Sequence, residues 1–422
     1  MASSEAQPIT DLSNPKTPLP FRVANSIARP LAPALFSLDE HNLLKSAQNK
    51  TGFEDFGEDS FREPLRVLLR ALEREAVLSS FGRLAARRLI IQLLSTRLIL
   101  QDMIVRHPEI LEERIEKPII IAGLPRTGTT HLHNLMAQDP ALRHIPYWES
   151  LEPFPPPVRN SGKPGLDTRR KDCEQALKFV DYIMPLFASM HEMTVDGPHE
   201  EMQLLAIHFS TMLFETMYLI PGYRDWYKAT DHTEAYRYVK RVLQAMQWQG
   251  GDRKRWVLKS PQHLEQFGPL LNVFPDACLV QTHRDPVRIT TSVCTMMAYA
   301  QRMNARKVEA RAVGRYWIDR TEDLLRASVE QRSLIPYKQA LDVRLHEYMT
   351  DQMGTLHRVY KFIDQPFTEE AQKAISAFIH NNPKGKNGTV RYDPNLVGIN
   401  PSERRKALKF YQDFFNVPDE GG

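Results

Sequence analysis

The sequence is poor in cysteine and contains no long apolar run. Three cysteines occur in 422 residues, none of them in a CxxC spacing, so neither a disulfide framework nor a zinc site is expected. The longest apolar stretch, residues 89–100, is interrupted by polar residues that include Arg97, which predicts a helix packed on protein rather than a membrane span. Residues 1–16 lack the basic start and apolar core of a signal peptide. We therefore expect a cytoplasmic protein.

A strong excess of charge of either sign is also absent. Lys and Arg number 55 and Asp and Glu 51, a formal net charge of +4, which gives no reason to expect a nucleic-acid partner. With 42% hydrophobic and 25% charged residues, a chain of this length buries a substantial core. The composition predicts one large globular domain with an extension.

Residues 117–136, KPIIIAGLPRTGTTHLHNLM, predict a buried strand, a tight turn and a helix. The apolar, β-branched run 119–122 suits a central strand covered on both faces, and Gly123 ends it. The turn passes through Pro125 and Gly128, after which a helix begins with its free backbone N–H groups facing the turn. Such a helix start attracts anions.

The turn lacks the Lys of a nucleotide-hydrolase loop. A GxxxxGK[ST] loop places Lys on the outer phosphates and Ser or Thr on magnesium, whereas Thr129 and Thr130 follow Gly128 here, and Arg126 is the only fixed positive charge. We therefore expect a guanidinium and backbone amides to hold the anion, with no metal. The alternative is an ordinary strand-to-helix turn.

Residues 256–294 predict a second motif on the same edge of the sheet. Strand 256–259, helix 264–274 and strand 277–282 form a β-α-β unit. Arg284 follows the second strand, and Asp285 and Pro286 suit the N-cap and first position of the next helix. Open parallel sheets bind ligands at the carboxyl ends of their strands. Two anion-binding loops at that edge suggest a ligand with two separated anionic groups.

These motifs resemble those of the sulfotransferases that use 3′-phosphoadenosine 5′-phosphosulfate (PAPS), in the bacterial-like branch with Arg in the first loop. GLPRTGTTHL is similar to the 5′-phosphosulfate loop, and HRDPVRITTSV to the 3′-phosphate motif, in which Arg284 is followed by Ser292. Residues 382–393, NPKGKNGTVRYD, resemble the basic loop that closes over the 3′-phosphate, although a turn rich in Lys and Gly is as often a solvated loop.

The resemblance implies an α/β fold with a parallel central sheet, flanking helices and a P-loop-like nucleotide-binding core. It implies PAPS as the co-substrate and no metal. His131 stands where cytosolic members usually have a Trp near the adenine, so stacking at this position is open. The donor-binding residues that the resemblance implies are Pro125, Arg126, Thr127, Gly128, Thr129, Thr130, His131, Arg284, Ser292, Lys384, Gly385 and Lys386.

The same resemblance implies catalytic roles for Arg126, Lys259 and a general base. Cytosolic members have a His two residues after this Lys, but Pro261 stands there and His263 follows two positions later. Tyrosine-sulfating relatives with the Arg-type loop use a Glu beyond the loop, and Glu149 lies near that place. We favour Glu149 as the base and keep His263 as the alternative. Each also has a structural alternative, an ion pair within a loop for Glu149 and a helix cap for His263.

Four segments are expected along the chain. Residues 1–35 are predicted to be extended or disordered, 36–112 to form a helical extension packed on the core, 113–405 to form the sulfotransferase-like domain, and 406–422 to form a C-terminal tail. The basic, amphipathic pattern of residues 62–106 leaves contact with a membrane surface as an alternative to a solvated face. A homo-oligomer is left open.

Residues 154–249 are expected to shape the acceptor pocket. They are rich in Met and aromatic residues, most of which we expect in the core, although the excess favours a hydrophobic alcohol, phenol or lipid over a carbohydrate. His191, His199, Glu200 and Glu201 interrupt this stretch as candidates to orient the acceptor hydroxyl. We therefore predict sulfuryl transfer from PAPS to a hydroxyl. The alternatives are a nucleoside-triphosphate-dependent phosphotransferase and a non-catalytic nucleotide-binding scaffold.

Overall fold

The computed structural model describes residues 6–157, 167–383 and 385–420. Its centre is a parallel five-stranded sheet with strand order β3-β4-β2-β5-β6. The strands are β2 (Ile119–Ala122), β3 (Leu142–Arg143), β4 (Arg255–Ser260), β5 (Cys278–His283) and β6 (Ala340–Arg344). The α/β fold class with a parallel central sheet is therefore confirmed, and the two motif-bearing strands β2 and β5 are neighbours.

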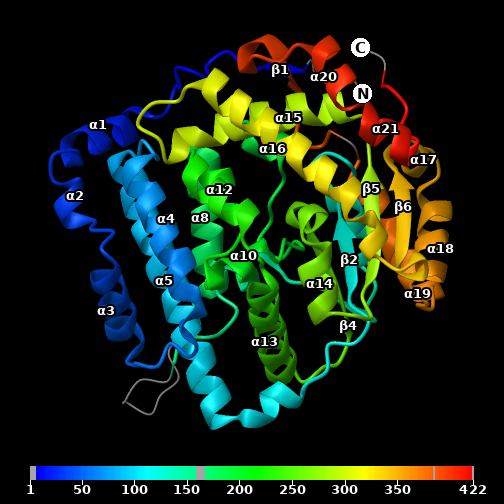
Figure 1. The fold of residues 1–422 in the computed structure, drawn as a ribbon, viewed down its shortest axis with the longest axis horizontal. Helices are drawn as coiled ribbons and strands as arrows, with labels where there is room; N and C mark the ends of the chain where they lie inside the picture. Colours follow the sequence, from blue (N-terminus) through cyan, green and yellow to red (C-terminus); the bar gives the residue numbers. More distant parts are fainter. Residues whose placement is uncertain (1–5, 158–166, 384, 421–422) are drawn as a thin grey trace.

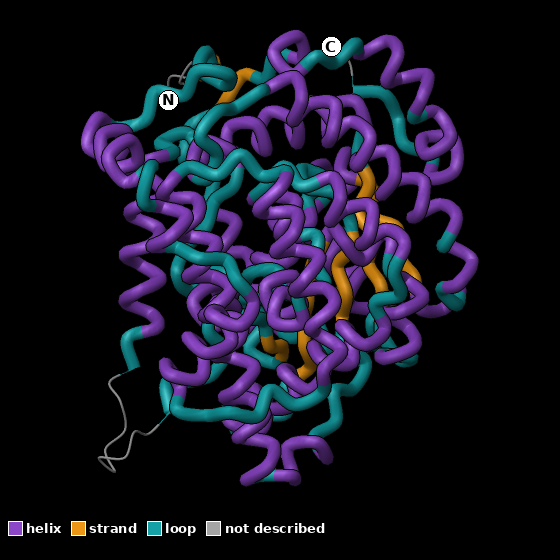
Figure 2. Tube along the Cα trace, turned by 60° about the vertical axis from the view of Figure 1, so that its left-hand side comes forward, coloured by secondary structure: helices purple, strands orange, loops and turns teal. Residues whose placement is uncertain are grey.

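Helices cover both faces of the sheet (Figures 1 and 2). Alternate residues of β2 enter different buried clusters, Ile119 and Ile121 on one face and Ile120 and Ala122 on the other. The first face packs against α6 (Thr129–Met136), α17 (Leu345–Thr350), α18 (Gln352–Phe362) and α19 (Glu369–Asn381). The second packs against α13 (Thr233–Gly250), α14 (Phe267–Val273), α15 (Pro286–Ala300) and α16 (Ala310–Glu330). This burial on two sides explains the unbroken apolar run that marks β2 in the sequence.

The N-terminal helices continue the second cluster away from the sheet. The helices α3 (Glu40–Thr51), α4 (Arg62–Arg74) and α5 (Ser80–Arg106) contribute buried side chains to the cluster that contains Ile120. In Figure 1 they lie at the side of the molecule opposite β6. No helix in the described ranges is both long enough and apolar enough to cross a membrane.

Residues 19–35 differ from the expected extended or disordered segment. They form α1 (Leu19–Ala28) and α2 (Ala32–Leu35). Nearer the start of the described chain, Gln7–Pro8 form the strand β1, which pairs in parallel with β7 (Val390–Arg391). Both helices carry a proline in their first turn, where the missing N–H costs no intrahelical hydrogen bond. The proline content that suggested irregular chain therefore marks helix starts.

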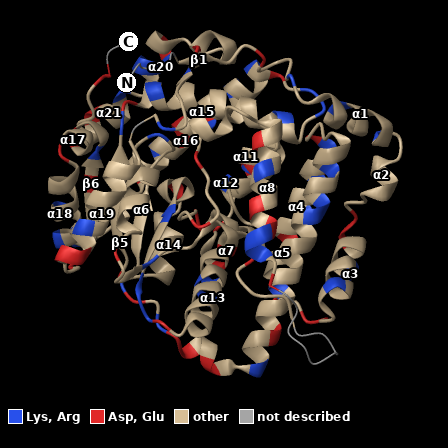
Figure 3. Cartoon of the chain, turned by 180° about the vertical axis from the view of Figure 1, so that it is seen from behind, with Lys and Arg blue, Asp and Glu red and all other residues tan. Residues whose placement is uncertain are grey.

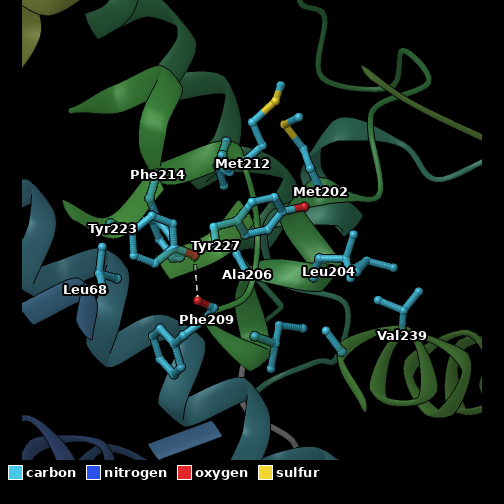
Figure 4. Packing of buried hydrophobic residues seen from close by; sticks show 14 of the residues in the cluster. Leu68, Met202, Leu204, Ala206, Phe209, Met212, Phe214, Tyr223, Tyr227 and Val239 are labelled. Atoms are coloured by element: carbon cyan, nitrogen blue, oxygen red, sulfur yellow. Dashed lines mark hydrogen bonds between the residues drawn. The ribbon is translucent and has the colours of Figure 1, made fainter. Parts of the chain in front are cut away.

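The remaining elements include a dense apolar layer that extends the second cluster. Residues 202–227 pack their Met and aromatic side chains into the cluster that they share with α4 and α13, and Figure 4 shows Leu68 of α4 beside Tyr223. The Tyr223 hydroxyl in this cluster donates to the Phe209 carbonyl at 2.7 Å. Core packing therefore accounts for much of the apolar excess. These elements are α7 (Tyr147–Leu151), α8 (Arg169–Ile183), α9 (Phe187–Met190), α10 (Met202–Leu205), α11 (Leu213–Met217), α12 (Pro221–Ala229), α20 (Pro401–Ala407) and α21 (Lys409–Phe415).

Candidate functional site

The loop between β2 and α6 is fixed against the end of β5. A Cβ atom at Gly123 would lie 2.3 Å from Thr282 Oγ1 and 2.9 Å from Thr127 Oγ1, so only glycine fits this approach. Thr127 Oγ1 lies 2.6 Å from Thr282 Oγ1 and donates to the Leu124 carbonyl at 2.7 Å. These contacts define the turn that the sequence predicts.

Arg126 stands exposed at the mouth of this loop in a left-handed conformation, with φ 74°. That conformation costs a non-glycine residue on the order of 1 kcal/mol. Its Nη1 atom donates to the Met190 carbonyl at 3.1 Å. Gly128, with φ 95°, is the N-cap of α6, and no side chain caps that helix. The first N–H groups of α6 and the Arg126 guanidinium therefore lie on the same short turn, as an anion site requires.

The second loop meets the first. Arg284 follows β5, and its Nη1 atom donates to the Arg126 carbonyl at 3.1 Å. Asp285 caps α15 by accepting from the Val287 backbone N–H at 2.9 Å. Ser292, two turns into α15, is buried, and its Oγ atom has no hydrogen-bond partner among the described residues. The structure thus brings Arg126 and Arg284 together at one edge of the sheet, and the helix that follows Arg284 carries an unpartnered hydroxyl.

The C-terminal segment occupies the second loop. Glu420 accepts from Arg284 Nε and Nη2 at 2.7 Å each, and its backbone N–H donates to Asp285 Oδ2 at 2.8 Å. Arg405 holds the Asp285 carboxylate through both terminal nitrogens and also bonds Asp419. A carboxylate therefore uses the guanidinium fork that suits a phosphate. Nothing in the sequence pattern of residues 406–422 indicates this contact.

A buried charge cluster lies at the end of β4. The Lys259 ammonium is paired with the Glu200 carboxylate, and it lies 3.5 Å from Thr130 Oγ1. The side chains of Lys259 and Glu200 are 3% and 13% exposed. Burial lowers the pKa of His191, and the charges that act on this imidazole are Glu200, which raises the pKa, and Lys259 and Arg126, which lower it further. Glu200, Lys259 and His191 therefore lie together beside the Arg126 loop.

His263 has both ring nitrogens engaged. In the 3-10 turn η4 (Pro261–Glu265), Nδ1 lies 2.7 Å from the Tyr236 hydroxyl, and Nε2 contacts the Glu201 carboxylate. The other oxygen of Glu201 accepts from the Lys259 backbone N–H at 2.8 Å. The imidazole is 1% exposed. This network ties the end of β4 to residue 201 and leaves no ring nitrogen available to a substrate.

The structure does not bring Glu149 to Arg126 or Lys259. Glu149 lies on α7, with Oε1 3.8 Å from an Arg143 terminal nitrogen. Arg143 belongs to β3, which pairs with the first residues of β4, and its guanidinium lies over the Trp256 ring at 4.4 Å. Burial raises the pKa of the Glu149 carboxyl. The backbone just before Glu149 lies beside the segment that leads to Glu200, with the Tyr147 N–H donating to the Gly197 carbonyl at 2.9 Å. The role of Glu149 as the base stays a prediction.

The remaining predicted donor residues surround the start of α6. Pro125 is partly exposed in the loop, Thr129 is buried beneath it, and Thr130 faces Lys259. His131 Nε2 lies 2.8 Å from Gln352 Oε1, and its ring lies 5.6 Å from the Tyr348 ring. This side chain is therefore engaged with α17 and α18.

The basic loop near residue 385 lies over the segment that Arg126 contacts. Lys384 lies outside the described residues. Gly385 has φ 83° in an exposed turn, and Lys386 Nζ lies 2.8 Å from Glu192 Oε1. A pocket of about 290 Å³ lies between Lys386, residues 192–199 and the Thr130 face of α6. The loop is thus part of the wall of a cavity beside the site.

An arginine-bearing loop follows each of two adjacent parallel strands, and a helix begins between them. This arrangement is typical of enzymes that bind an anionic donor. A model of the sulfotransferase family matches residues 118–369. The chain therefore belongs to the sulfotransferase family, and the resemblance seen in its motifs is confirmed. It is an enzyme that transfers sulfate.

Known proteins of the same kind are similar over most of the chain. The sulfotransferase STF9 from Mycobacterium avium has 28% sequence identity and a TM-score of 0.79, covering 91% of this chain and 98% of that one. STF1 from Mycobacterium tuberculosis has 29% identity and a TM-score of 0.76, covering 88% and 98%. The omega-hydroxy-beta-dihydromenaquinone-9 sulfotransferase Stf3 of Mycobacterium bovis is 24% identical over 327 residues, which cover 72% of this chain and 77% of that protein.

Proposed function

We propose that this sulfotransferase uses PAPS as its donor and transfers the sulfuryl group to a hydroxyl of a hydrophobic, lipid-like acceptor. The observation that carries the donor assignment is the junction of the two loops, where Arg284 donates to the Arg126 carbonyl. Two guanidinium groups at one sheet edge suit a ligand with anionic groups at two positions. The unpartnered Ser292 hydroxyl gives a further donor for the same ligand. The similarity to Stf3, whose name specifies a menaquinone-derived acceptor, supports the lipid-like acceptor.

The reaction is an in-line displacement at sulfur. The acceptor oxygen forms a bond to sulfur while the bond between sulfur and the 5′-phosphate oxygen breaks, which releases 3′-phosphoadenosine 5′-phosphate (PAP). Negative charge builds on the leaving phosphate and the sulfuryl oxygens, so catalysis rests on positioning and electrostatics, as in phosphoryl transfer. Arg126 and the N–H groups at the start of α6 would stabilise the phosphate, and Lys259 and Thr130 the sulfuryl oxygens.

An alcohol needs a base to take its proton as the new bond forms. Three carboxylate or imidazole groups compete for this role. His263 has no free ring nitrogen, and Glu149 is paired with Arg143. Glu200 is the carboxylate in contact with Lys259, so we assign it as the base. We expect the acceptor hydroxyl to bind Glu200 in place of the Lys259 ammonium.

Replacement of Glu200 by Gln is expected to lower kcat by roughly 10²- to 10⁴-fold, the usual contribution of a positioned base. The amide keeps the size of the side chain but accepts no proton, so the acidic limb of the pH–rate profile should also disappear. Steady-state rates across pH with one accepted alcohol measure both effects. Parallel Glu149→Gln and His263→Ala variants are the comparison. If Glu149→Gln alone abolishes turnover, Glu149 is the base, as the sequence predicts, and the assignment of Glu200 is wrong.

Calorimetric titration tests the donor without knowledge of the acceptor. PAP, with ATP plus magnesium as comparison, should bind in the micromolar range without metal, and ATP should bind far more weakly. Preference for ATP with magnesium would favour a phosphotransferase. Binding of neither ligand would remove the support for PAPS as donor.

Glu420→Gln is expected to tighten PAP binding by roughly threefold to tenfold, because the 3′-phosphate must displace the Glu420 carboxylate from Arg284 and this ion pair is partly solvent-exposed. The same titration measures it. Asp413→Asn is the matched control, since Asp413 pairs with Lys409 on α21 and its replacement removes the same charge. Equal tightening by both variants would mean that general electrostatics, not competition for Arg284, sets the affinity.

A further inference from the structure

The helices α1 and α2 present a row of exposed apolar side chains. Leu19, Val23, Ile27, Leu31 and Leu35 recur every four residues and are between 46% and 72% exposed. No side chain of α1 is buried. Exposed apolar residues are ordinary when single, but a contiguous row marks a surface that meets an apolar partner. We call these five residues the apolar row.

The inner side of α1 is firmly held, so the row is not a loose end of the chain. The Phe21 ring packs edge-to-face against the Phe81 ring at 5.3 Å. Asn25 accepts from the Phe81 backbone N–H through Oδ1 and from the Ser80 hydroxyl through its carbonyl, both at 2.8 Å. The Arg83 Nε atom donates to the carbonyl of Phe36, just past α2, at 2.9 Å. The start of α5 therefore fixes both helices and turns the row outward.

The charges within the segment that carries the row have one sign. Residues 12–38 contain no Asp or Glu, and Lys16, Arg22 and Arg29 are exposed. In Figure 3, where acidic residues are red, α1 and α2 lie at the rim of the molecule without red. By contrast, some of the arginines of α4 and α5 that suggested a membrane face in the sequence have acidic partners within the protein. Arg66 pairs with Glu40, Arg83 with Glu73 and Arg106 with Asp102.

The row is connected to the transfer site through α8. The Phe179 ring of α8 lies 6.2 Å from the Phe21 ring and 5.2 Å from the Phe81 ring, and Tyr182, one turn further, is 53% exposed. The chain then continues through α9 to Met190, whose carbonyl accepts from Arg126. Residues 179–190 thus lead from the side chains packed beside the row to the Arg126 loop.

We propose that α1 and α2 dock the enzyme on an anionic lipid bilayer, with the apolar row in the headgroup region and Lys16, Arg22 and Arg29 against acidic headgroups. An apolar helix face flanked by basic residues alone is the pattern of interfacial helices. Docking in this orientation presents α8 and the path to Arg126 to the membrane. A lipid acceptor then keeps its tail in the bilayer while its hydroxyl reaches the site. This last step depends on the proposed acceptor, whereas the docking itself does not.

Vesicle flotation of the full chain tests the docking. Wild type is expected to float with vesicles of phosphatidylcholine and phosphatidylglycerol and to bind pure phosphatidylcholine far less. Val23→Asp/Ile27→Asp should lose about tenfold or more of the binding. Arg22→Gln/Arg29→Gln should lose roughly fivefold per residue, and only on the anionic vesicles. Leu334→Asp/Tyr337→Asp is the matched control, because these side chains are 54% and 96% exposed and the charge change is the same. The control should float like wild type.

Two results would overturn the proposal. One is wild type that stays unbound with both vesicles. The other would come from analytical ultracentrifugation without lipid, if wild type is dimeric and Val23→Asp/Ile27→Asp is monomeric. That result would assign the row to a second copy of the chain. Circular dichroism and thermal unfolding show whether each variant is folded. PAP titration of the same variants should be unchanged, so a loss of flotation with intact PAP binding separates docking from the donor assignment.

Discussion

Arg126→Ala is expected to lower kcat/KM by roughly 10³-fold or more, which is the scale on which arginines that stabilise a transferring anionic group act. The guanidinium stands at the loop mouth beside the free N–H groups of α6, where charge builds on the leaving phosphate. The effect should fall mainly on kcat, because the interaction strengthens as the sulfur–oxygen bond breaks. Steady-state kinetics with PAPS and a short-chain alcohol or phenol measure it.

Two further variants separate this role from charge and folding. Arg126→Lys keeps the charge but loses the bidentate fork, so it should recover only part of the activity. Arg237→Ala removes an exposed arginine of α13 that pairs with Glu234, and it should behave like wild type. Because Arg126 is exposed and its left-handed backbone strains Ala as much as Arg, its replacement should change thermal stability little. Retention of most activity by a folded Arg126→Ala protein would show that the loop does not stabilise the leaving group.

The sheet was predictable because its strands carry local signals. The apolar run of β2, the Gly that ends it, and the Asp-Pro start of α15 each require a specific backbone conformation, and the structure confirms all three. The α1 and α2 helices were missed because their prolines read equally well as irregular chain. Only contacts with α5, which is distant in sequence, make that short segment helical.

Residues of the site were predictable where they belong to a loop and less so where they meet across elements. The loops of Arg126 and Arg284 follow neighbouring strands, so topology alone brings them together. Glu149 was chosen by its distance along the chain from the loop, and its side chain lies beside Arg143 of β3, so its role as the base stays a prediction. Glu200 and Glu420 reach the site from other elements, and no spacing rule in a single sequence connects them to Lys259 or Arg284.

Arg320→Leu is expected to destabilise the protein by about 3–5 kcal/mol, the usual cost of removing one partner of a buried ion pair. The side chain is fully buried, with Nε 3.0 Å from Glu215 Oε2 and Nη1 2.7 Å from Glu265 Oε2. The Tyr316 hydroxyl also donates to Glu215 at 2.8 Å. Without Arg320, two buried carboxylates remain with no cation between them. Urea unfolding followed by fluorescence measures the loss.

The pH dependence of this loss identifies its cause. Burial already raises the pKa of Glu215, and Arg320 opposes that rise, so removal of Arg320 should raise the folded-state pKa further. A carboxyl whose pKa is higher in the folded state than in the unfolded state binds more protons in the folded state. Its destabilising effect therefore grows as the pH rises above the pKa that it has in the unfolded state. The deficit of Arg320→Leu should therefore be larger at alkaline than at mildly acidic pH. Glu215→Gln and Glu265→Gln in the same background should recover part of the stability.

A surface pair on the same helix gives the contrast. Arg326→Ala breaks an exposed pair with Glu322 and should cost no more than about 1 kcal/mol at any pH. Equal losses for the two variants would mean that burial does not govern the Arg320 network. The comparison bears on catalysis, because Glu265 belongs to η4 directly after β4, and Glu215 belongs to α11. Arg320 therefore holds η4, which directly follows the strand of Lys259, against α11, and a folded Arg320→Leu protein should lose kcat as well as stability.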